Sequence, residues 1–210
     1  MSQFFVIHPD NPQARLIKQA AAMVRDGAVI VYPTDSCYAL GCHLDDKDAV
    51  QRIRQIRGVD DSHHLTLVCR DLSEISNYAR VGNVQFRLMK NNTPGSYTFI
   101  LQATKEVPRR LQHPKRNTIG VRIPDHPIAL ALLEELGEPL LSSTLILPDD
   151  DHRPLSDPEE IRDLLERRVD LVIDGGAVGL EPTTVIDLTG EAPELVRQGK
   201  GEVAHFGIED

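Results

Sequence analysis

Ala28–Tyr32 is an uninterrupted apolar run, and it sets the first limit on the fold of the chain. A strand with one face in water alternates apolar and polar residues, whereas a continuous run is typical of a strand covered on both faces. Residues 12–26 carry apolar side chains at helical spacing, so we expect a helix capped by Asn11 and closed by Gly27. The start of the chain therefore predicts a buried strand with a helix packed near it.

Short apolar runs and helical segments alternate along the rest of the chain without a strict order. This pattern predicts an α/β fold with a mixed, twisted sheet and helices packed on it. No repeat or low-complexity linker divides the sequence, so we expect a single domain over residues 1–210. The expected helices are 47–57, 72–78, 84–91, 127–136 and one capped by Ser156 or Asp157, and the expected strands are 4–8, 28–32, 65–69, 97–101, 119–123, 139–147, 171–173, 184–188 and 195–197.

The composition limits the class of protein further. Apolar residues make up 40% of the 210 residues, which is enough for a sizeable core, but aromatic residues make up only 4%, so aliphatic side chains must fill that core. Three cysteines without a framework spacing favour a reducing compartment. No apolar run is long enough for a membrane span, and the first residues lack the features of a signal peptide. We therefore expect a cytoplasmic protein with no membrane partner.

The net charge of -9 conceals a strong segregation of charge. Residues 51–122 carry 13 basic and 5 acidic side chains, whereas residues 123–210 carry 6 basic and 21 acidic ones. A basic segment in an acidic protein indicates an anionic partner for that segment. The alternative is that the two segments neutralise each other in the fold, and charge alone does not decide between them.

The segment Tyr32–Gly41, with the sequence YPTDSCYALG, is the first candidate site. A buried strand leads into a proline turn and then into the hydroxyl groups of Thr34, Ser36 and Tyr38, at the sheet edge where open α/β sheets bind ligands. The alternative is an ordinary turn in which Thr34 and Asp35 bond to their own backbone. The residues alone leave both interpretations open.

Arg52, Arg54 and Arg57 lie on one predicted helix and form the second candidate site. Because Arg54 and Arg57 are three positions apart, their guanidinium groups can share a face and grip one polyphosphate. The alternative is a solvated, charged helix face.

Residues 93–124 form the third candidate site, since Glu106 is the one acidic residue among several basic ones. Basic side chains with little offsetting charge suit contacts to phosphates, which supply affinity rather than sequence specificity. The alternative is a solubilising surface loop. The basic residues for which we predict RNA contacts are Arg54, Arg109, Arg110, Lys115 and Arg116.

Motifs for metals and nucleophiles are weak or missing in the sequence. Cys37, Cys42 and His43 have no second ligand pair downstream, and His63 and His64 are adjacent rather than one helical turn apart. There is no G-x-S-x-G, Walker or G-x-G-x-x-G motif. A nucleotide site would therefore depend on arginine and hydroxyl side chains, and we predict no protein-ligated metal.

Four segments occur in a specific order over nearly the whole chain: Tyr32–Gly41, Thr93–Leu101, Ile119–Asp125, and Pro182–Asp187 followed by Arg197–Gly199. Together they resemble the YrdC/YciO family, most closely its YciO branch. The resemblance implies a single α/β domain around a twisted sheet with a positively charged concave cavity. It also implies binding of double-stranded RNA or tRNA, and L-threonylcarbamoyladenylate synthase activity. In that reaction ATP, threonine and bicarbonate give an intermediate for the threonylcarbamoyl modification of tRNA.

The resemblance implies roles for particular residues as well. Threonine carbamate attacks the α-phosphate of ATP while pyrophosphate leaves, so this nucleotidyl transfer requires alignment of two anions and no protein nucleophile. Mg²⁺ would accompany the phosphates. The residues implied are Arg57, Thr98, Arg122, Thr144 and Arg197 for the nucleotide, and Thr34, Tyr38 and Thr184 for threonine.

Two triplets depart from the family pattern. Members with synthase activity carry Lys-x-Arg where this chain has Gln55–Arg57, and Ser-x-Asn where it has Thr144–Ile146. A charged hydrogen bond contributes about 1.5–3 kcal/mol, so both losses together would slow the reaction on the order of a hundredfold or more. We therefore expect binding with weak or altered synthase activity. The alternatives are a competent synthase, in which Arg54 compensates, and a non-catalytic protein-interaction domain that uses the acidic residues 123–210.

Overall fold

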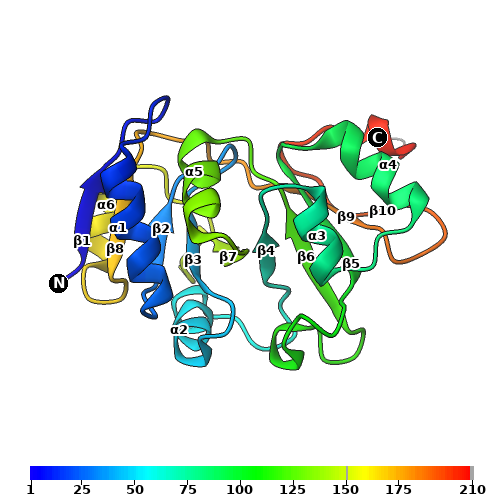
Figure 1. The fold of residues 1–210 in the computed structure, drawn as a ribbon, viewed down its shortest axis with the longest axis horizontal. Helices are drawn as coiled ribbons and strands as arrows, with labels where there is room; N and C mark the ends of the chain where they lie inside the picture. Colours follow the sequence, from blue (N-terminus) through cyan, green and yellow to red (C-terminus); the bar gives the residue numbers. More distant parts are fainter. Residues whose placement is uncertain (150, 209–210) are drawn as a thin grey trace.

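The structure is a computed structural model that describes residues 1–149 and 151–208, and ten strands of this part form one mixed sheet (Figure 1). This sheet, with helices packed on it, confirms the predicted α/β class. Among the described helices none combines the length and the apolar character that a membrane span requires. The strands are β1 (Gln3–Val6), β2 (Ile30–Tyr32), β3 (Ala39–His43), β4 (Thr66–Val68), β5 (Tyr97–Gln102), β6 (Thr118–Arg122), β7 (Leu140–Thr144), β8 (Leu171–Asp174), β9 (Thr184–Asp187) and β10 (Glu194–Arg197).

The order of strands across the sheet is β1-β8-β2-β3-β7-β4-β6-β5-β9-β10, so the first and last strands lie at opposite edges. Figure 1 accordingly shows the two termini at opposite ends of the molecule. The helices are α1 (Ala14–Arg25), α2 (Lys47–Arg57), α3 (Leu72–Tyr78), α4 (Asn83–Asn92), α5 (Pro127–Leu136) and α6 (Pro158–Leu165), with short 3-10 turns η1 (Arg109–Leu111) and η2 (Ala204–Phe206).

The strands β1, β8, β2, β3 and β7 form what we call the covered half of the sheet, because helices pack on both of its faces. On one face, Ile17 of α1 is buried in an apolar cluster with Ile30, Leu140 and residues of α5. On the other face, Ile53 of α2 is buried in a second cluster with Leu40 and residues of α6. All three residues of β2 are buried, as the apolar run predicted.

Gly41 shows how tightly the covered half is packed. A Cβ atom at this position of β3 would lie 2.6 Å from Leu140 Cδ2 and 2.9 Å from Tyr32 Cε1. Since interiors are close-packed, these neighbours could not make room without moving other core side chains. Only glycine fits here.

The strands β4, β6, β5, β9 and β10 form the open half, in which one face alone is packed against helices. The register places Leu67, Val121 and Phe99 next to one another on that face, and all three are fully buried. α3 and α4 lie over them in Figure 1, and the ring of Phe99 lies 5.8 Å from that of Phe206 in η2. Because side chains alternate along a strand, Thr66, Gly120 and Thr98 point to the opposite face. On that face Val68, beside the covered half, is buried in the cluster of α1 and α5, whereas these three residues belong to neither apolar cluster.

The boundaries of α1 differ from the prediction. The helix begins at Ala14, and the capping position is Gln13 rather than Asn11. The reason lies in the preceding turn, where the amide of Asn11 donates to Nδ1 of His8 and the amide of His8 donates to the side chain of Gln13. These local bonds hold residues 8–13 outside the helix. The predicted stop is confirmed, since Gly27 has a φ of 95°.

β3 is the strand that sequence patterning missed, because its residues continue the turn segment that begins at Tyr32. It pairs antiparallel with both β2 and β7 and so joins them in the middle of the covered half. The other predicted helices and strands are present, some with ends shifted by a few residues. The helix capped by Asp157 is α6, and this side chain accepts from the amide of Glu159 at 2.9 Å.

Part of the segregated charge is neutralised inside the fold. Arg52 lies 2.8 Å from Asp170, and Arg116 lies 2.6 Å from Asp187. In both pairs a cation of the basic segment meets an acid of the acidic segment, as the alternative interpretation of the charge pattern proposed. Arg57 of the basic segment has no such partner among the described residues, and together with Arg197 of the acidic segment it defines the site described next.

Candidate functional site

The uncovered face of the open half is hollowed into a space of about 310 Å³, which we call the central cavity. β4, β6, β5 and β9 supply its floor, and the end of α2, the loop after α2, β7 and β10 supply its walls. The register accounts for this, since Thr66 pairs with Gly120 and Thr98 pairs with Val185 across neighbouring strands. The lining residues are Arg57, Ser62, His63, His64, Thr66, Thr98, Ile100, Gly120, Ser143, Thr144, Thr183, Val185, Val196 and Arg197.

Gly120 leaves space at the floor of the central cavity, because it has no side chain. A Cβ atom there would lie 3.1 Å from Oγ1 of Thr66 and 3.2 Å from Cγ2 of Thr98. Any larger side chain would project into the space between these two threonines. The absence of a side chain at this position therefore preserves the volume for a ligand.

Arg57 and Arg197 line the central cavity from segments that lie far apart in the sequence. Arg57 is the last residue of α2, and its Nη1 donates to the carbonyl oxygen of Ile146 at 3.3 Å. Arg197 is the last residue of β10, and its Nε and Nη2 donate to the carbonyl oxygen of Thr183 at 3.1 and 2.8 Å. These backbone contacts orient the two guanidinium groups without neutralising them.

No carboxylate of the described residues lies within ion-pair distance of Arg57 or Arg197. Burial, reinforced by the positive charge of Arg197, lowers the pKa of Arg57 to about 10. Burial also lowers the pKa of Arg197. Both arginines remain charged at neutral pH, so the central cavity holds two cations that have no counter-charge within the part of the chain that the structure describes.

The pKa of His63 is lowered in part by the same positive charges. Burial is the main reason that its pKa falls to about 4, and the neighbouring charges of Arg57 and Arg54 lower it further. The imidazole is therefore neutral at physiological pH and can accept as well as donate a hydrogen bond. An anion in the central cavity would relieve the repulsion that all of these groups experience.

Two threonine hydroxyls lie beside Arg197. The Oγ1 atoms of Thr98 and Thr183 are 2.8 Å apart, and Nη2 of Arg197 donates to Oγ1 of Thr183 at 3.2 Å. Whichever hydroxyl donates to the other, one hydroxyl hydrogen of the pair stays unused in these contacts. That hydrogen can donate to a ligand oxygen, as phosphate recognition requires.

Four of the five residues predicted for the nucleotide line the central cavity: Arg57, Thr98, Thr144 and Arg197. The fifth, Arg122, is buried and does not line the cavity. Its Nη2 forms an ion pair with Asp35, and its Nη1 donates to Oγ of Ser36 at 3.1 Å. Arg122 is therefore the one guanidinium of the five residues whose charge the protein itself already balances.

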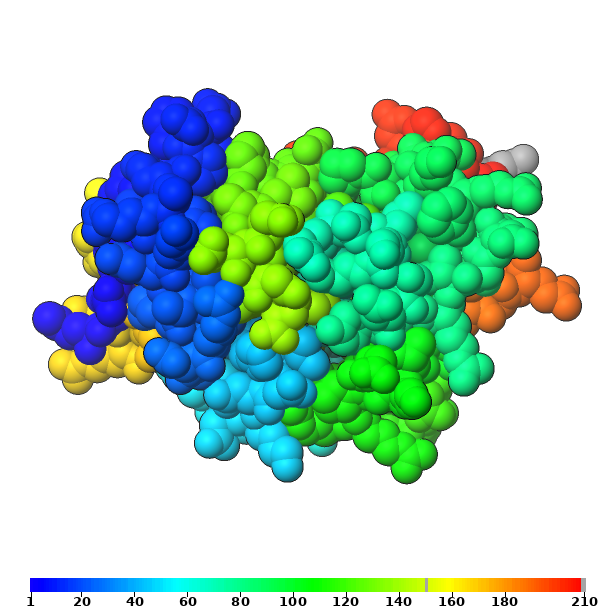
Figure 2. All heavy atoms as spheres, viewed as in Figure 1, coloured from blue at the N-terminus to red at the C-terminus, as the bar shows by residue number. Residues whose placement is uncertain are grey.

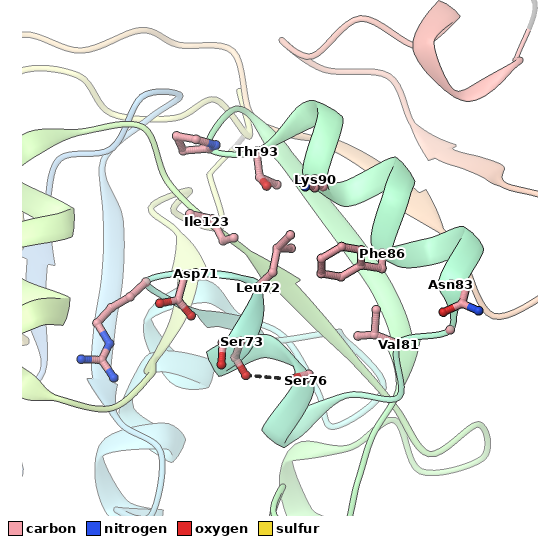
Figure 3. Close-up of a pocket in the computed structure, with 13 residues that line it drawn as sticks. Asp71, Leu72, Ser73, Ser76, Val81, Asn83, Phe86, Lys90, Thr93 and Ile123 are labelled. Carbon is pink, nitrogen blue, oxygen red and sulfur yellow. Dashed lines mark hydrogen bonds between the residues drawn. The ribbon is translucent and has the colours of Figure 1, made fainter.

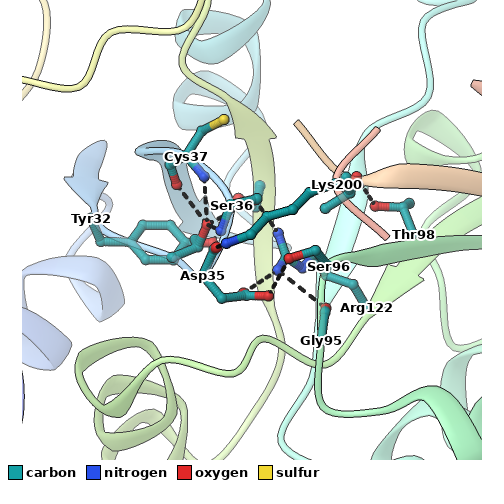
Figure 4. A network of polar contacts seen from close by, with 12 residues as sticks. Tyr32, Asp35, Ser36, Cys37, Gly95, Ser96, Thr98, Arg122 and Lys200 are labelled. Atoms are coloured by element: carbon teal, nitrogen blue, oxygen red, sulfur yellow. Dashed lines mark hydrogen bonds and ion pairs between the residues drawn. The ribbon is translucent and has the colours of Figure 1, made fainter. Parts of the chain in front are cut away.

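Asp35 is the centre of the network that holds Arg122 (Figure 4). Its carboxylate also accepts from Oγ of Ser96 at 2.7 Å, and its carbonyl oxygen accepts from Nζ of Lys200. The four side chains come from the loop after β2, the loop before β5, β6 and the segment after β10. This network ties the covered half to the open half next to the central cavity.

The three residues predicted for threonine are buried, and their hydroxyl groups bond to the backbone. Oγ1 of Thr34 donates to the carbonyl oxygen of Cys37 at 2.6 Å, as in the ordinary turn that was the alternative for this segment. The hydroxyl of Tyr38 donates to Gly176, and that of Thr184 donates to Gly201, each at 2.6 Å. All three side chains shape loops near the central cavity and do not line it, and their contact with threonine stays a prediction.

The five residues predicted for RNA do not form one surface. Arg116 pairs with Asp187, and Lys115 is exposed in the loop after η1. The side chain of Arg54 is only 5% exposed, and its Nη1 donates to the carbonyl oxygen of Asp60 at 2.7 Å. Arg54 and Arg57 therefore do not grip one ligand together, because Arg54 faces a different pocket, which it shares with Arg109 and Arg110.

The two departures from the family pattern lie close to Arg57. Gln55 is exposed on α2, while the carbonyl oxygen of Ile146 is the acceptor that holds Nη1 of Arg57. Neither side chain lines the central cavity. Arg54 does not stand in for the missing lysine there, since its guanidinium is directed to the loop carbonyl of Asp60.

Sequence reasoning missed His63 and Thr183. His63 was weighed as a metal ligand and set aside, and no sequence motif links it to Arg57. Thr183 is adjacent to Thr184, which was predicted for threonine. Thr184 is fully buried and its hydroxyl donates to Gly201, so Thr183 is the one of the two that lines the cavity. Val185 and Ile186 are both apolar, so the sequence shows no alternation that would tell which of the two threonines faces the cavity.

A larger space of about 780 Å³ lies between α3 and α4 (Figure 3). Leu72, Val81 and Phe86 give it an apolar lining, and its two cations are Arg70 and Lys90. Arg70 is already engaged by Glu74 at 2.9 Å. This groove lacks the unpaired guanidinium groups that distinguish the central cavity, and we do not assign a ligand to it.

Among the described residues no group of three or more His, Cys, Asp or Glu side chains is placed to hold a metal ion. The thiols of Cys37, Cys42 and Cys69 are buried and unpaired. Burial raises the pKa of Cys37 to about 11 and that of Cys42 to about 12, so neither is a thiolate at neutral pH. The chemistry of the site therefore depends on guanidinium, hydroxyl and imidazole groups.

The fold and the cavity together define an α/β protein with a cationic hollow on one uncovered face of its sheet. Residues 22–199 match the family Sua5/YciO/YrdC, which is described as "Telomere recombination". The chain is 64% identical over 206 residues to the uncharacterized protein YciO of Escherichia coli K12, covering 98% of this chain and 100% of that one. It is 30% identical over 181 residues to the threonylcarbamoyl-AMP synthase of Halorhodospira halophila, covering 85% and 93% of the two chains. The chain belongs to the Sua5/YciO/YrdC family.

Solved structures agree with this assignment. The crystal structure of E. coli YciO superposes with a TM-score of 0.95 over 98% of this chain and 100% of that one. P. abyssi Sua5 complexed with L-threonine gives a TM-score of 0.86 at 26% identity, covering 94% of this chain and 58% of that one. The family that the sequence motifs indicated is thereby confirmed.

Proposed function

We propose that the central cavity binds ATP and that the protein is a weak or altered L-threonylcarbamoyladenylate synthase that also binds tRNA or double-stranded RNA. The observation that carries the proposal is the pair Arg57 and Arg197, two guanidinium groups that line one cavity and lack a carboxylate partner in the described residues. A triphosphate supplies the negative charge that this pair lacks. The relationship to named threonylcarbamoyl-AMP synthases and to a Sua5 protein complexed with L-threonine supports the choice of substrates.

In the proposed reaction the amine nitrogen of threonine first attacks the carbon of bicarbonate, and the hydroxyl of bicarbonate leaves as water with a proton of the amine, which gives a carbamate. An oxygen of the resulting carbamate attacks the α-phosphorus of ATP, and the bond to the bridging oxygen of pyrophosphate breaks. Arg57 and Arg197 would stabilise the charge that develops on the leaving phosphates. The free hydroxyl hydrogen of the pair Thr98 and Thr183 would donate to a phosphate oxygen. Catalysis would thus rest on alignment and charge stabilisation.

Mg²⁺ would enter the cavity together with ATP. The lining contains hydroxyl groups and no carboxylate, which suits an ion that keeps its water ligands and binds mainly through phosphates. Thr98, Thr144 and Thr183 are the side chains that would lie near it. The ion would neutralise charge on the triphosphate during transfer.

The substituted triplets account for the weakness that we propose. Gln55 supplies no charge, and Ile146 offers its backbone carbonyl to Arg57 but no side-chain amide. Neither change removes Arg57 or Arg197, so the affinity for nucleotide should persist while the rate falls. Each missing charged contact would cost about 1.5–3 kcal/mol in the transition state.

The test is calorimetric titration with ATP, followed by pyrophosphate release in the presence of threonine and bicarbonate. Arg57→Gln and Arg197→Gln should each weaken ATP binding by roughly tenfold to a hundredfold, since each removes a charged hydrogen bond. Arg52→Gln is the matched control, because Arg52 lies on the same helix and pairs with Asp170 outside the cavity. Equal losses in all three variants would contradict the assignment of the cavity.

A second comparison separates weak catalysis from full activity. The double change Gln55→Lys and Ile146→Asn should raise the rate of pyrophosphate release by about a hundredfold if both contacts were lost in the transition state. An unchanged rate would instead indicate a competent synthase. RNA binding is tested by its salt dependence, since an affinity that does not fall with added salt would exclude contacts to phosphates.

A further inference from the structure

A second cationic pocket, of about 330 Å³, lies between α2 and η1, and we call it the basic pocket. Lys47 and Arg54 line it from one face of α2, seven positions apart and therefore two turns along the same side. Arg109 and Arg110 of η1 line it from the opposite side. In Figure 2 α2 (cyan) and the segment that contains η1 (green) are in contact at the lower edge of the molecule.

The charges of the basic pocket are poorly balanced. Asp61 is its one acidic lining residue, and its Oδ1 lies 3.7 Å from Nε of Arg54 with the Asp61 side chain 84% exposed. Lys47, Arg109 and Arg110 have no carboxylate within ion-pair distance in the described part of the chain. The basic pocket is therefore lined by four cationic side chains and by one carboxylate, which is mostly exposed to solvent.

Arg110 adds an independent observation. Its Nη2 donates to the carbonyl oxygen of Leu44 at 3.1 Å, which fixes the guanidinium against the end of β3. Its Nη1 is shielded from solvent and makes no hydrogen bond among the described residues. Water therefore solvates this charge only in part, and an anion in the pocket would offset it.

The basic pocket is separate from the central cavity. Arg54 faces the former and Arg57 the latter, and no residue lines both. The loop after α2 lies between them: Asp61 contributes to the basic pocket, whereas Ser62 and His63 contribute to the central cavity. Nη1 of Arg54 holds this loop through the carbonyl oxygen of Asp60.

We propose that the basic pocket binds a backbone phosphate of the RNA, as a site distinct from the one for ATP. This inference rests on the RNA binding proposed above and specifies where it occurs. Lys47 and Arg109, whose side chains are exposed, would contact the phosphate, while Arg54 and Arg110 supply fixed positive charge behind it. The contact carries no base specificity, so the pocket adds affinity for any strand of suitable shape.

The test uses the double variant Lys47→Gln and Arg109→Gln, with Arg15→Gln and Lys18→Gln as a matched control. Both pairs are exposed and remove the same charge, but the control residues lie on α1 in the covered half. The measurement is the affinity for tRNA and for a duplex RNA over a series of salt concentrations. The pocket variant should lose about tenfold in affinity, and the slope of log K against log salt should fall by about one, because one phosphate contact is lost. The control variant should keep the slope of the wild type, and both should bind ATP unchanged.

The outcomes separate the two proposals. Failure of the wild type to bind either RNA would overturn the proposed RNA binding itself. RNA binding by the wild type with equal slopes in both variants would overturn the assignment to the basic pocket and leave RNA binding intact. A loss of affinity for pyrophosphate instead of RNA would also overturn it, because the pocket would then serve a free phosphate. Arg110→Lys, which retains the charge and loses the bond to Leu44, should give a smaller loss with an unchanged slope.

Discussion

The two halves of the sheet are built from the same kind of strand, but they use their faces differently. In the covered half both faces of β2 and β3 are packed, with Ile30 in the cluster beneath α1 and α5 and Leu40 in the cluster beneath α2. In the open half Phe99 is packed, while its neighbour Thr98 lines the central cavity. A strand of the covered half thus packs side chains into a core on both of its faces. A strand of the open half packs side chains into a core on one face and lines the central cavity with the other.

This difference indicates that stability and ligand affinity depend on separate sets of residues. The central cavity on the polar face of the open half holds Arg57 and Arg197, which no described carboxylate pairs with, and the repulsion between their charges opposes folding. The covered half and the packed face of the open half have to offset that cost through burial. Substitutions in the two halves should therefore produce different kinds of defect.

The largest effect is expected in the covered half. Ile30→Ala and Leu40→Ala should each lower the free energy of unfolding by about 2–5 kcal/mol, because each leaves a cavity in a fully buried cluster. Chemical denaturation measures this loss. Thr98→Ala, on the open face, should cost only about 1 kcal/mol, the value of the bond to Thr183. Similar losses at all three positions would contradict the division into halves.

Two glycines give a sharper comparison, because substitution by alanine adds the same methyl group at each position. Gly41→Ala should destabilise the fold, since its Cβ would meet Leu140 at 2.6 Å in the covered half. Gly120→Ala, and more strongly Gly120→Val, should lower ATP affinity by about tenfold or more while changing the unfolding midpoint little, because the added atoms occupy cavity volume. Calorimetry and thermal unfolding of all three variants provide the measurement. A stable Gly120→Val protein with unchanged ATP affinity would place the nucleotide elsewhere.

The smallest effect is a shift in a titration. The pKa of His63 should lie at about 4, and ATP should raise it, because a triphosphate offsets the charge of Arg57 and Arg54 that lowers it. NMR of the imidazole, with and without ATP, measures both values. A titration that ATP leaves unchanged would argue against phosphate close to His63.

The same group makes the folded state sensitive to acid. The ordinary pKa of histidine is 6.5, so between pH 6.5 and 4 the unfolded chain binds a proton at His63 that the folded chain does not. The protonation of His63 therefore does not affect the free energy of unfolding above pH 6.5, and it lowers this free energy as the pH falls from 6.5 toward 4. His63→Gln should reduce this decline in denaturation measurements.

Local sequence signals predicted much of the fold. The bounds of α2, α3 and α5 follow the predicted ranges, since capping residues and glycines mark their ends. The start of α1 was not predictable, because bonds involving His8 and Gln13 compete with the helix. The order of strands was also out of reach. It depends on pairings between distant segments, such as β1 with β8, which periodicity does not encode.

The candidate site was predicted in part and for specific reasons. The family motifs predicted that Arg57 and Arg197 contact the same ligand, and both line one cavity although most of the chain separates them. They did not reveal that Asp35 neutralises Arg122, or that Thr183 rather than Thr184 faces the cavity. Both features depend on which way a side chain points, and a change of one position on a strand reverses this.

The place of β10 at the edge of the sheet has a consequence for the newly made protein. Arg197 belongs to this strand, whereas Arg57 lies on α2, so a ribosome-bound chain acquires one cation of the central cavity well before the other. Chains that stop short of β10 would have most of the sheet but only one of these two guanidinium groups. Under the function proposed above, such chains would hold nucleotide poorly, and synthesis of β10 is the step that completes the pair.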